Sequence, residues 1–249
     1  MSGHSKWSTI KRKKAANDAQ RSKTWSKLLR FVEVAAREGG GDIDSNPTLA
    51  TAVQKAKQGS VPNDNIERAI KRGTGELQGE SYEETSYEGY GPGGVAILVK
   101  CLTNNRNRAA QDVRSVFNGY GGKLSEPGAV AWMFEPKGLI IVPRSSADED
   151  DVFLAAADAG AEDVRGSEES IEVVTAPDSL RSVREALESA GIEVDSADLT
   201  QVPKSTVTVE GGEAKRVLSL IDNLEELDDV QEVYANFDIS DDVLASLAS

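Results

Sequence analysis

Three segments near the start of the chain place apolar residues at helical spacing. Between Thr24 and Arg37 the apolar positions recur at steps of three and four, which puts them on one face of a helix: Trp25, Leu28, Leu29, Val32, Ala35 and Ala36. A second helix is predicted after Asn46-Pro47, a cap residue followed by a proline at the favoured first position. A third is predicted over residues 64–73. Residues 24–75 are therefore predicted to form a compact three-helix domain.

Beyond residue 94 the pattern changes to strands that alternate with helices. Short apolar runs predict strands at 95–101, 129–134, 138–143, 161–165, 170–175, 192–202, 205–210 and 230–238. Helical spacing predicts helices at 107–121, 148–160, 179–191 and 213–227. The intervening stretch GTGELQGESYEETSYEGYGPGG, residues 73–94, is rich in Gly, Ser and acid and predicts a linker and a turn.

The order of these elements predicts an α+β, multidomain protein. Residues 138–203 alone complete one ferredoxin-like βαββαβ unit, and the flanking βαβ halves, 94–135 and 204–238, complete a second one around it. The predicted domains are a basic arm (1–23), the helical domain (24–75), a split α/β domain (76–137 plus 204–249) and an inserted α/β domain (138–203).

The charge is divided unequally along the chain. The 249 residues carry a formal net charge of -14, yet residues 1–75 hold 15 Lys and Arg against 7 Asp and Glu. Between Lys6 and Arg30 there are nine cationic residues and one acid, Asp18. Such asymmetry predicts a polyanionic partner for the basic part. The remaining 174 residues, at net -22, must face away from that partner or face something basic.

The sequence also indicates where the protein works. The longest apolar runs are strand-sized, so no membrane helix and no membrane partner are predicted. No apolar run follows the basic N-terminus, which argues against a secretory signal. A mitochondrial presequence is disfavoured because the basic run contains Asp18 and passes without a break into a helix. A single cysteine fits a reducing compartment, and we expect a cytoplasmic protein.

The amino-acid composition gives little support for a catalytic site. His4 is the only histidine and Cys101 the only cysteine, so no His/Cys metal cluster can form. Cys101 is predicted to be a small buried residue, and the abundant acids a solvated surface. The glycines of GYGPGG (89–94) precede a strand, unlike those of phosphate-binding loops. We expect no enzyme, no cofactor and no small-molecule substrate; a hydrolase using acidic clusters is the distant alternative.

The basic arm carries the stronger signal. Dense Lys and Arg neutralise phosphates, and Trp7 could stack on an unpaired base or dock the arm through Ile10, whereas Trp25 lies on an apolar face and is predicted to be core. The stretch LTNNRNR (102–108) follows a strand and opens a helix, so it is either a phosphate site or a capped helix with two surface arginines. The candidate nucleic-acid-binding residues are His4, Lys6, Trp7, Lys11, Arg12, Lys13, Lys14, Arg21, Lys23, Lys27, Arg30, Arg106 and Arg108.

Several long motifs resemble those of the YebC-type proteins. They are GHSKW at 3–7, KAANDAQRSKTWSKLLR at 14–30, GGDIDSNP at 40–47, RAIKRGTG at 68–75, YEGYGPGGVAILVKCLTNNRNR at 87–108 and VRSVFNGYGGKL at 113–124. The resemblance covers essentially the whole chain. Bacterial relatives commonly have TDNRNR where this chain has TNNRNR, so Asn104 replaces an acid.

The resemblance implies a helical domain plus two α/β domains and no enzymatic activity. Members are described as probable cytoplasmic transcriptional regulators that bind DNA, whereas others resemble ribosome-associated factors that assist translation. A DNA-binding role would require a helix in the major groove, with Asn63, Asn65 and Arg68 as the plausible base readers. For ribosomal RNA, shape, phosphates and stacking suffice. We favour RNA, because a strongly acidic body beside a long duplex is unfavourable unless it is held well away.

Overall fold

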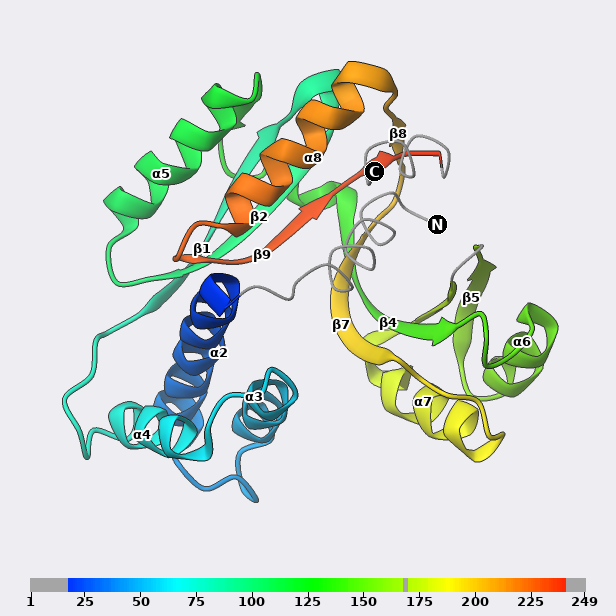
Figure 1. Ribbon diagram of the computed structural model, residues 1–249, viewed down its shortest axis with the longest axis horizontal. Coiled ribbons are helices and arrows are strands. Elements are labelled where there is room, and N and C mark those ends of the chain that lie inside the picture. The colour runs from blue at the N-terminus through cyan, green and yellow to red at the C-terminus, as the bar shows by residue number, and fades with distance from the viewer. Residues whose placement is uncertain (1–17, 168–169, 241–249) are drawn as a thin grey trace. The chain divides into compact units, whose positions relative to one another are not determined.

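The computed structural model describes residues 18–167 and 170–240. Their contacts divide them into two compact units: residues 18–129 with 212–233, and the described part of 130–211 with 234–240. The first unit contains three N-terminal helices and a four-stranded sheet, and the second contains another four-stranded sheet (Figure 1). No helix in these ranges is both long enough and apolar enough to cross a membrane.

The three predicted N-terminal helices are confirmed. They are α2 (Asp18–Gly39), α3 (Pro47–Gln58) and α4 (Asn63–Gly73). Asn46 caps α3, because its side-chain oxygen accepts from Leu49 N at 3.0 Å, and its amide nitrogen donates to the Ala35 carbonyl of α2 at 2.8 Å. Trp25 packs against the core of this domain and donates its indole N–H to the Gly59 carbonyl at 2.8 Å, as its place on the apolar face predicted.

The sheet of the first unit has the strand order β3-β1-β2-β9. Its strands are β1 (Glu83–Tyr90), β2 (Ala96–Thr103), β3 (Lys123–Ser125) and β9 (Val230–Ala235). The helices α5 (Arg106–Gly119) and α8 (Gly211–Glu225) lie on the same face (Figure 1), because a Cβ added at Gly89 would meet Phe117 of α5 and one at Gly91 would meet Leu220 of α8.

Two predictions for this region are wrong. The stretch predicted as a linker contains β1, which pairs antiparallel with β2 over its full length and with β3 over three residues. Gly89 is needed there, since a Cβ would lie 2.7 Å from the Phe117 ring. The apolar run 129–134 is not a strand: Ala131–Met133 forms a 3-10 turn, and Trp132 is 65% exposed. The strand that follows α5 in this sheet is instead β3, and β1 lies between β3 and β2.

The sheet of the second unit is ferredoxin-like, as predicted. Its elements are β4 (Phe134–Pro143), α6 (Glu149–Ala157), β5 (Ala161–Gly166), β6 (Ser170–Thr175), α7 (Leu180–Ser189) and β7 (Ser196–Pro203). The strand order is β5-β6-β4-β7, and all neighbours are antiparallel. Its core consists of Ile140, Val142, Val152, Ala156, Ile171, Val173, Val183, Leu187 and Ile192.

The last predicted strands are shorter in the structure. Within 205–210 only β8 (Val207–Thr208) forms, and it pairs in parallel with β10 (Phe237–Asp238) as a separate two-stranded sheet. The strand predicted from residue 192 begins at Ser196. The described elements thus give the α+β fold with N-terminal helices and two antiparallel four-stranded sheets.

We predict that residues 130–211 fold when they are expressed alone, because the nine core residues of the second sheet all lie inside this range. A shorter fragment, 138–203, should be less stable, since it lacks the Phe134–Lys137 half of β4 that pairs with Thr200–Pro203. Circular dichroism during thermal unfolding checks both fragments. If the longer fragment shows no cooperative transition, residues 130–211 do not fold on their own.

Candidate nucleic-acid interface

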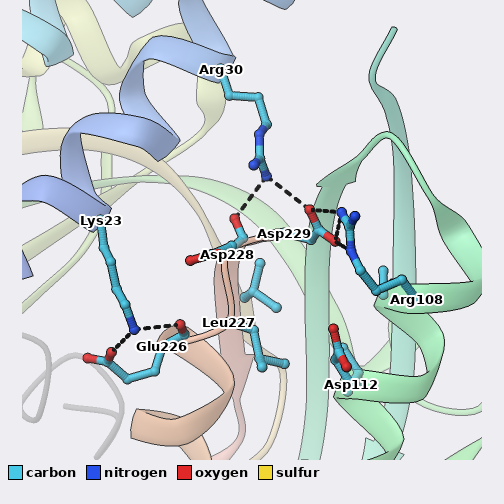
Figure 2. A pocket seen from close by; sticks show the side chains of 11 residues that line it. Lys23, Arg30, Arg108, Asp112, Glu226, Leu227, Asp228 and Asp229 are labelled. Atoms are coloured by element: carbon cyan, nitrogen blue, oxygen red, sulfur yellow. Dashed lines mark hydrogen bonds and ion pairs between the residues drawn. The ribbon is translucent and has the colours of Figure 1, made fainter. Parts of the chain in front are cut away.

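The structure describes only part of the predicted binding residues. His4, Lys6, Trp7, Lys11, Arg12, Lys13 and Lys14 lie outside the described residues, and Arg21 lies in α2 without a described side chain. The others fall into two groups: Lys23, Lys27 and Arg30 on α2, and Arg106 and Arg108 in the first turn of α5. Three of these five, Lys23, Arg30 and Arg108, line one cavity of about 540 Å³ (Figure 2).

The cations of α2 face Glu225, the last residue of α8, and an acidic loop, residues 226–229, which connects α8 to β9. Lys23 Nζ lies 2.9 Å from the Glu226 carboxylate, and this hydrogen bond raises the pKa of the ammonium group above its ordinary value. Lys27 Nζ donates to the Glu225 carbonyl at 2.5 Å, and the Arg30 guanidinium donates to the Asp228 carbonyl at 2.8 Å. The end of a helix presents unpaired carbonyls, so cations are favoured there.

Arg30 and Arg108 converge on a single buried carboxylate, Asp229 (Figure 2). Arg108 donates to both carboxylate oxygens, at 2.8 and 3.0 Å through Nη2, and Arg30 Nη1 lies 3.2 Å from Oδ1. The Thr103 hydroxyl donates to Oδ2 at 3.0 Å. The hydrogen bond to Asp229 raises the pKa of the Arg108 guanidinium. Asp229 therefore joins α2, the end of β2 and the start of α5.

The prediction that the acidic residues form a solvated surface is wrong for a few carboxylates, which are buried. Asp229 is 6% exposed, and Glu33 on α2 is 3% exposed and accepts from Arg72 Nε at 3.1 Å. Sequence reasoning missed both. The run EELDD at 225–229 was a usable signal for the first, because it lies at the end of a helix that carries apolar residues on its inner face. Nothing in the sequence indicated which cations would meet it.

The first turn of α5 is capped by a side chain of the protein itself. Asn105 accepts from the Arg108 main-chain N–H at 3.1 Å, so the cap is filled by the chain itself. Arg106 is exposed and lies 3.8 Å from Glu83. Asn104 accepts from Arg108 at 2.8 Å and donates its amide to Glu80 at 2.5 Å. An aspartate at position 104 would have no N–H to donate to Glu80. This hydrogen bond explains why an amide fits position 104 in this chain.

The residues proposed to read DNA bases lie at the start of α4. Arg68 is exposed, but it donates to Asn65 Oδ1 at 2.8 Å and to the Asp64 carbonyl at 3.2 Å. Asp64 and Glu67 are exposed on the same two turns. Their carboxylates would be repelled by the phosphates that flank a major groove.

Electrostatics defines what the cavity can do. Its lining combines Lys23, Arg30 and Arg108 with the carboxylates of Asp112, Glu226, Asp228 and Asp229. A phosphate group could use these cations only in exchange for the carboxylates and carbonyls that they now contact. The cavity is not lined by a cysteine: Cys101 is buried, and desolvation raises its pKa to about 12, which leaves the thiol protonated at neutral pH.

We predict that Asp229→Ala lowers the free energy of unfolding by about 2 to 4 kcal/mol, because it leaves Arg30 and Arg108 without the carboxylate that they share. Glu226→Ala should cost less than about 1 kcal/mol, since the Lys23 pair is about half exposed. Urea unfolding of the two variants checks the contrast. Equal losses would show that the buried carboxylate has no special role.

Comparisons with known proteins agree over the whole chain. The profile of the TACO1/YebC protein N-terminal domain matches residues 5–76, and that of the TACO1/YebC second and third domain matches residues 82–237. A protein of Rubrobacter xylanophilus is 55% identical over 249 residues, with 100% of both chains covered, and one of Pelotomaculum thermopropionicum is 55% identical over 243 residues, covering 97% of this chain and 100% of the relative. Both are named probable transcriptional regulatory protein.

A crystal structure of a conserved hypothetical protein from Aquifex aeolicus has the same fold. It superimposes with a TM-score of 0.80 at 47% sequence identity, covering 91% of this chain and 94% of that one. The resemblance inferred from the motifs is thus confirmed by sequence and by structure. The chain belongs to the TACO1/YebC family.

Proposed function

We propose that this protein is a non-enzymatic, nucleic-acid-binding regulator of gene expression. The observation that carries the proposal is the segregation of charge: residues 1–75 have 15 Lys and Arg against 7 acids, whereas the rest of the chain has 13 against 35. A polyanion is attracted to the first part and repelled by the second. The names of the relatives, probable transcriptional regulatory protein, support a regulatory role.

The cations that the structure describes are not equally available. Lys23, Lys27, Arg30 and Arg108 contact acidic side chains or carbonyls. Lys57 and Lys71 are exposed, and within the described ranges neither has an acidic partner. Five cations, and no acid, lie in residues 1–17. The arm therefore supplies the first contact in our proposal, and the cations of α2 join when the nucleic acid replaces the acidic loop.

Ribosomal RNA on the ribosome is the target that we favour. The exposed acids of α4, Asp64 and Glu67, oppose an approach to the major groove, where this helix would have to read bases. Folded RNA places fewer demands on the protein, because phosphates, shape and unpaired bases suffice for binding. Duplex DNA is the second candidate, favoured by the names of the relatives. We place either activity in the cytoplasm.

The decisive experiment measures both targets with one preparation at one ionic strength. On the RNA proposal the protein co-sediments with ribosomes at moderate salt, is released as salt rises, and loses most of this binding when residues 1–23 are removed. Short duplexes should bind without preference at about 10⁻⁴ to 10⁻⁶ M. The substitutions Lys11→Ala, Arg12→Ala, Lys13→Ala and Lys14→Ala together should reduce the salt slope by about 0.7 to 0.9 per lost phosphate contact and leave the melting temperature unchanged.

Two results would contradict this proposal. A duplex bound roughly a thousandfold more tightly than scrambled DNA, without ribosome association, would establish the DNA candidate instead. Unchanged affinity for both targets in the fourfold arm variant would remove the arm from the interface altogether.

We also predict that Glu226→Gln strengthens nucleic-acid binding by about two- to fivefold, because it frees Lys23 from an exposed ion pair. The salt slope should rise by about one phosphate contact. Glu38→Gln is the matched control, since it removes one exposed negative charge from α2, the helix that carries Lys23, and Glu38 has no cationic partner among the described residues. A similar gain in both variants would mean that only the net charge matters.

A further inference from the structure

The exposed face of α6 carries two large apolar side chains. Leu154 is 71% exposed, the highest fraction among the large hydrophobic residues that the structure describes, and Phe153 beside it is 55% exposed. Val152 and Ala156 on the opposite face are fully buried in the core of the second sheet. The fold therefore uses the inner face of this helix and gains nothing from a phenylalanine and a leucine on the outer one. Adjacent exposed apolar side chains form a patch of the kind that partner proteins cover.

Carboxylates surround these side chains. Asp150 lies three and four residues before Phe153 and Leu154, so it occupies the same side of the helix, and Asp151 and Asp158 flank Leu154. All three are exposed, and no Lys or Arg of the described ranges forms an ion pair with them. The neighbouring helix α7 differs, because its Glu185 and Glu188 are each held at 2.7 Å by Arg181 and Arg184. Asp150, Asp151 and Asp158 are thus available to an external cation, whereas Glu149 of the same helix pairs with Arg144.

Helix electrostatics explains only some of these acids. Asp150 and Asp151 are in the first turn, where the helix dipole favours negative charge. Asp158 is at the C-cap, where the dipole disfavours it. Residues 138–203 as a whole carry 4 Lys and Arg against 16 Asp and Glu, so the segment that contains this helix is acidic.

We propose that the outer face of α6, defined by Asp150, Asp151, Phe153, Leu154 and Asp158, binds a basic segment of a partner protein that places an apolar residue between lysines or arginines. The apolar side chain covers Phe153 and Leu154, and the cations reach the carboxylates on either side. Nucleic acids and anionic membranes are repelled by this surface. A second copy of the chain is disfavoured as well, because it would oppose like charges. The inference does not depend on whether the basic arm binds RNA or DNA.

The experiment uses the full-length protein and a fluorescent peptide in which one Leu lies between Lys residues on both sides. Binding is measured by fluorescence anisotropy. Phe153→Ala with Leu154→Ala, and separately Asp150→Asn with Asp151→Asn, should each weaken binding about tenfold. Asp178→Asn with Glu193→Gln is the matched control, because it removes two exposed charges from the same unit outside α6 and should change affinity less than about twofold.

Several outcomes would overturn the proposal. They are the absence of peptide binding to the unaltered protein, an equal loss in the control, and binding that survives the loss of Phe153 and Leu154. A gain in affinity when residues 1–17 are deleted would show instead that the chain's own basic arm occupies the face. In cells, a photo-crosslinking residue at position 154 should capture peptides that mass spectrometry maps to Lys- and Arg-rich segments containing an apolar residue. Capture of nucleic acid or of a second copy would contradict the partner that we propose.

Discussion

The carboxylate of Asp229 links three elements of the first unit. It is nearly inaccessible to water, and its oxygens accept from Arg30 of α2, Thr103 at the end of β2 and Arg108 of α5. A buried carboxylate is tolerated only when such donors replace the water that it has lost. Asp229 therefore joins α2, β2 and α5, and α2 is fixed to the sheet by the positive charge of Arg30, which would also attract it to phosphate.

The parts of the fold that could be predicted from the sequence are those whose burial is decided locally. Helices α3 and α4 and the elements of the second sheet have apolar residues at the period of their own geometry, so each could be assigned without knowing its neighbours. Strand β1 could not be assigned this way. Its sequence, EETSYEGY, has few apolar residues, and it becomes a strand because β2 and β3 pair with it on both sides. The run at 129–134 failed for the opposite reason, since hydrophobicity alone does not supply a pairing partner.

The sequence identified the cations of the candidate site, but it did not identify the acidic residues that they contact. Composition showed that Lys23, Lys27 and Arg30 share a basic segment, yet their contacts come from residues about two hundred positions later, 199 in the case of Arg30 and Asp229. A single sequence has no local signal for a pair at that separation. The fold changes the interpretation of these cations, because an ion pair must be exchanged before any of them meets a phosphate, whereas an unpaired lysine binds at no such cost.

This difference in availability concentrates the proposed function in a short stretch of chain. Residues 18–75 contain ten Lys and Arg against seven acids, and Lys23, Arg30, Arg37 and Arg72 among them are already in ion pairs. The excess positive charge that a polyanion requires therefore comes mainly from the five cations of residues 1–17. At the same time Asp150, Asp151 and Asp158 are exposed beside Phe153 and Leu154, and no Lys or Arg of the described ranges forms an ion pair with them. A target that offers nucleic acid to the basic arm and basic protein to α6 would meet opposite charge at both surfaces. A bare duplex satisfies only one, and a ribosome, being RNA with basic proteins, offers both.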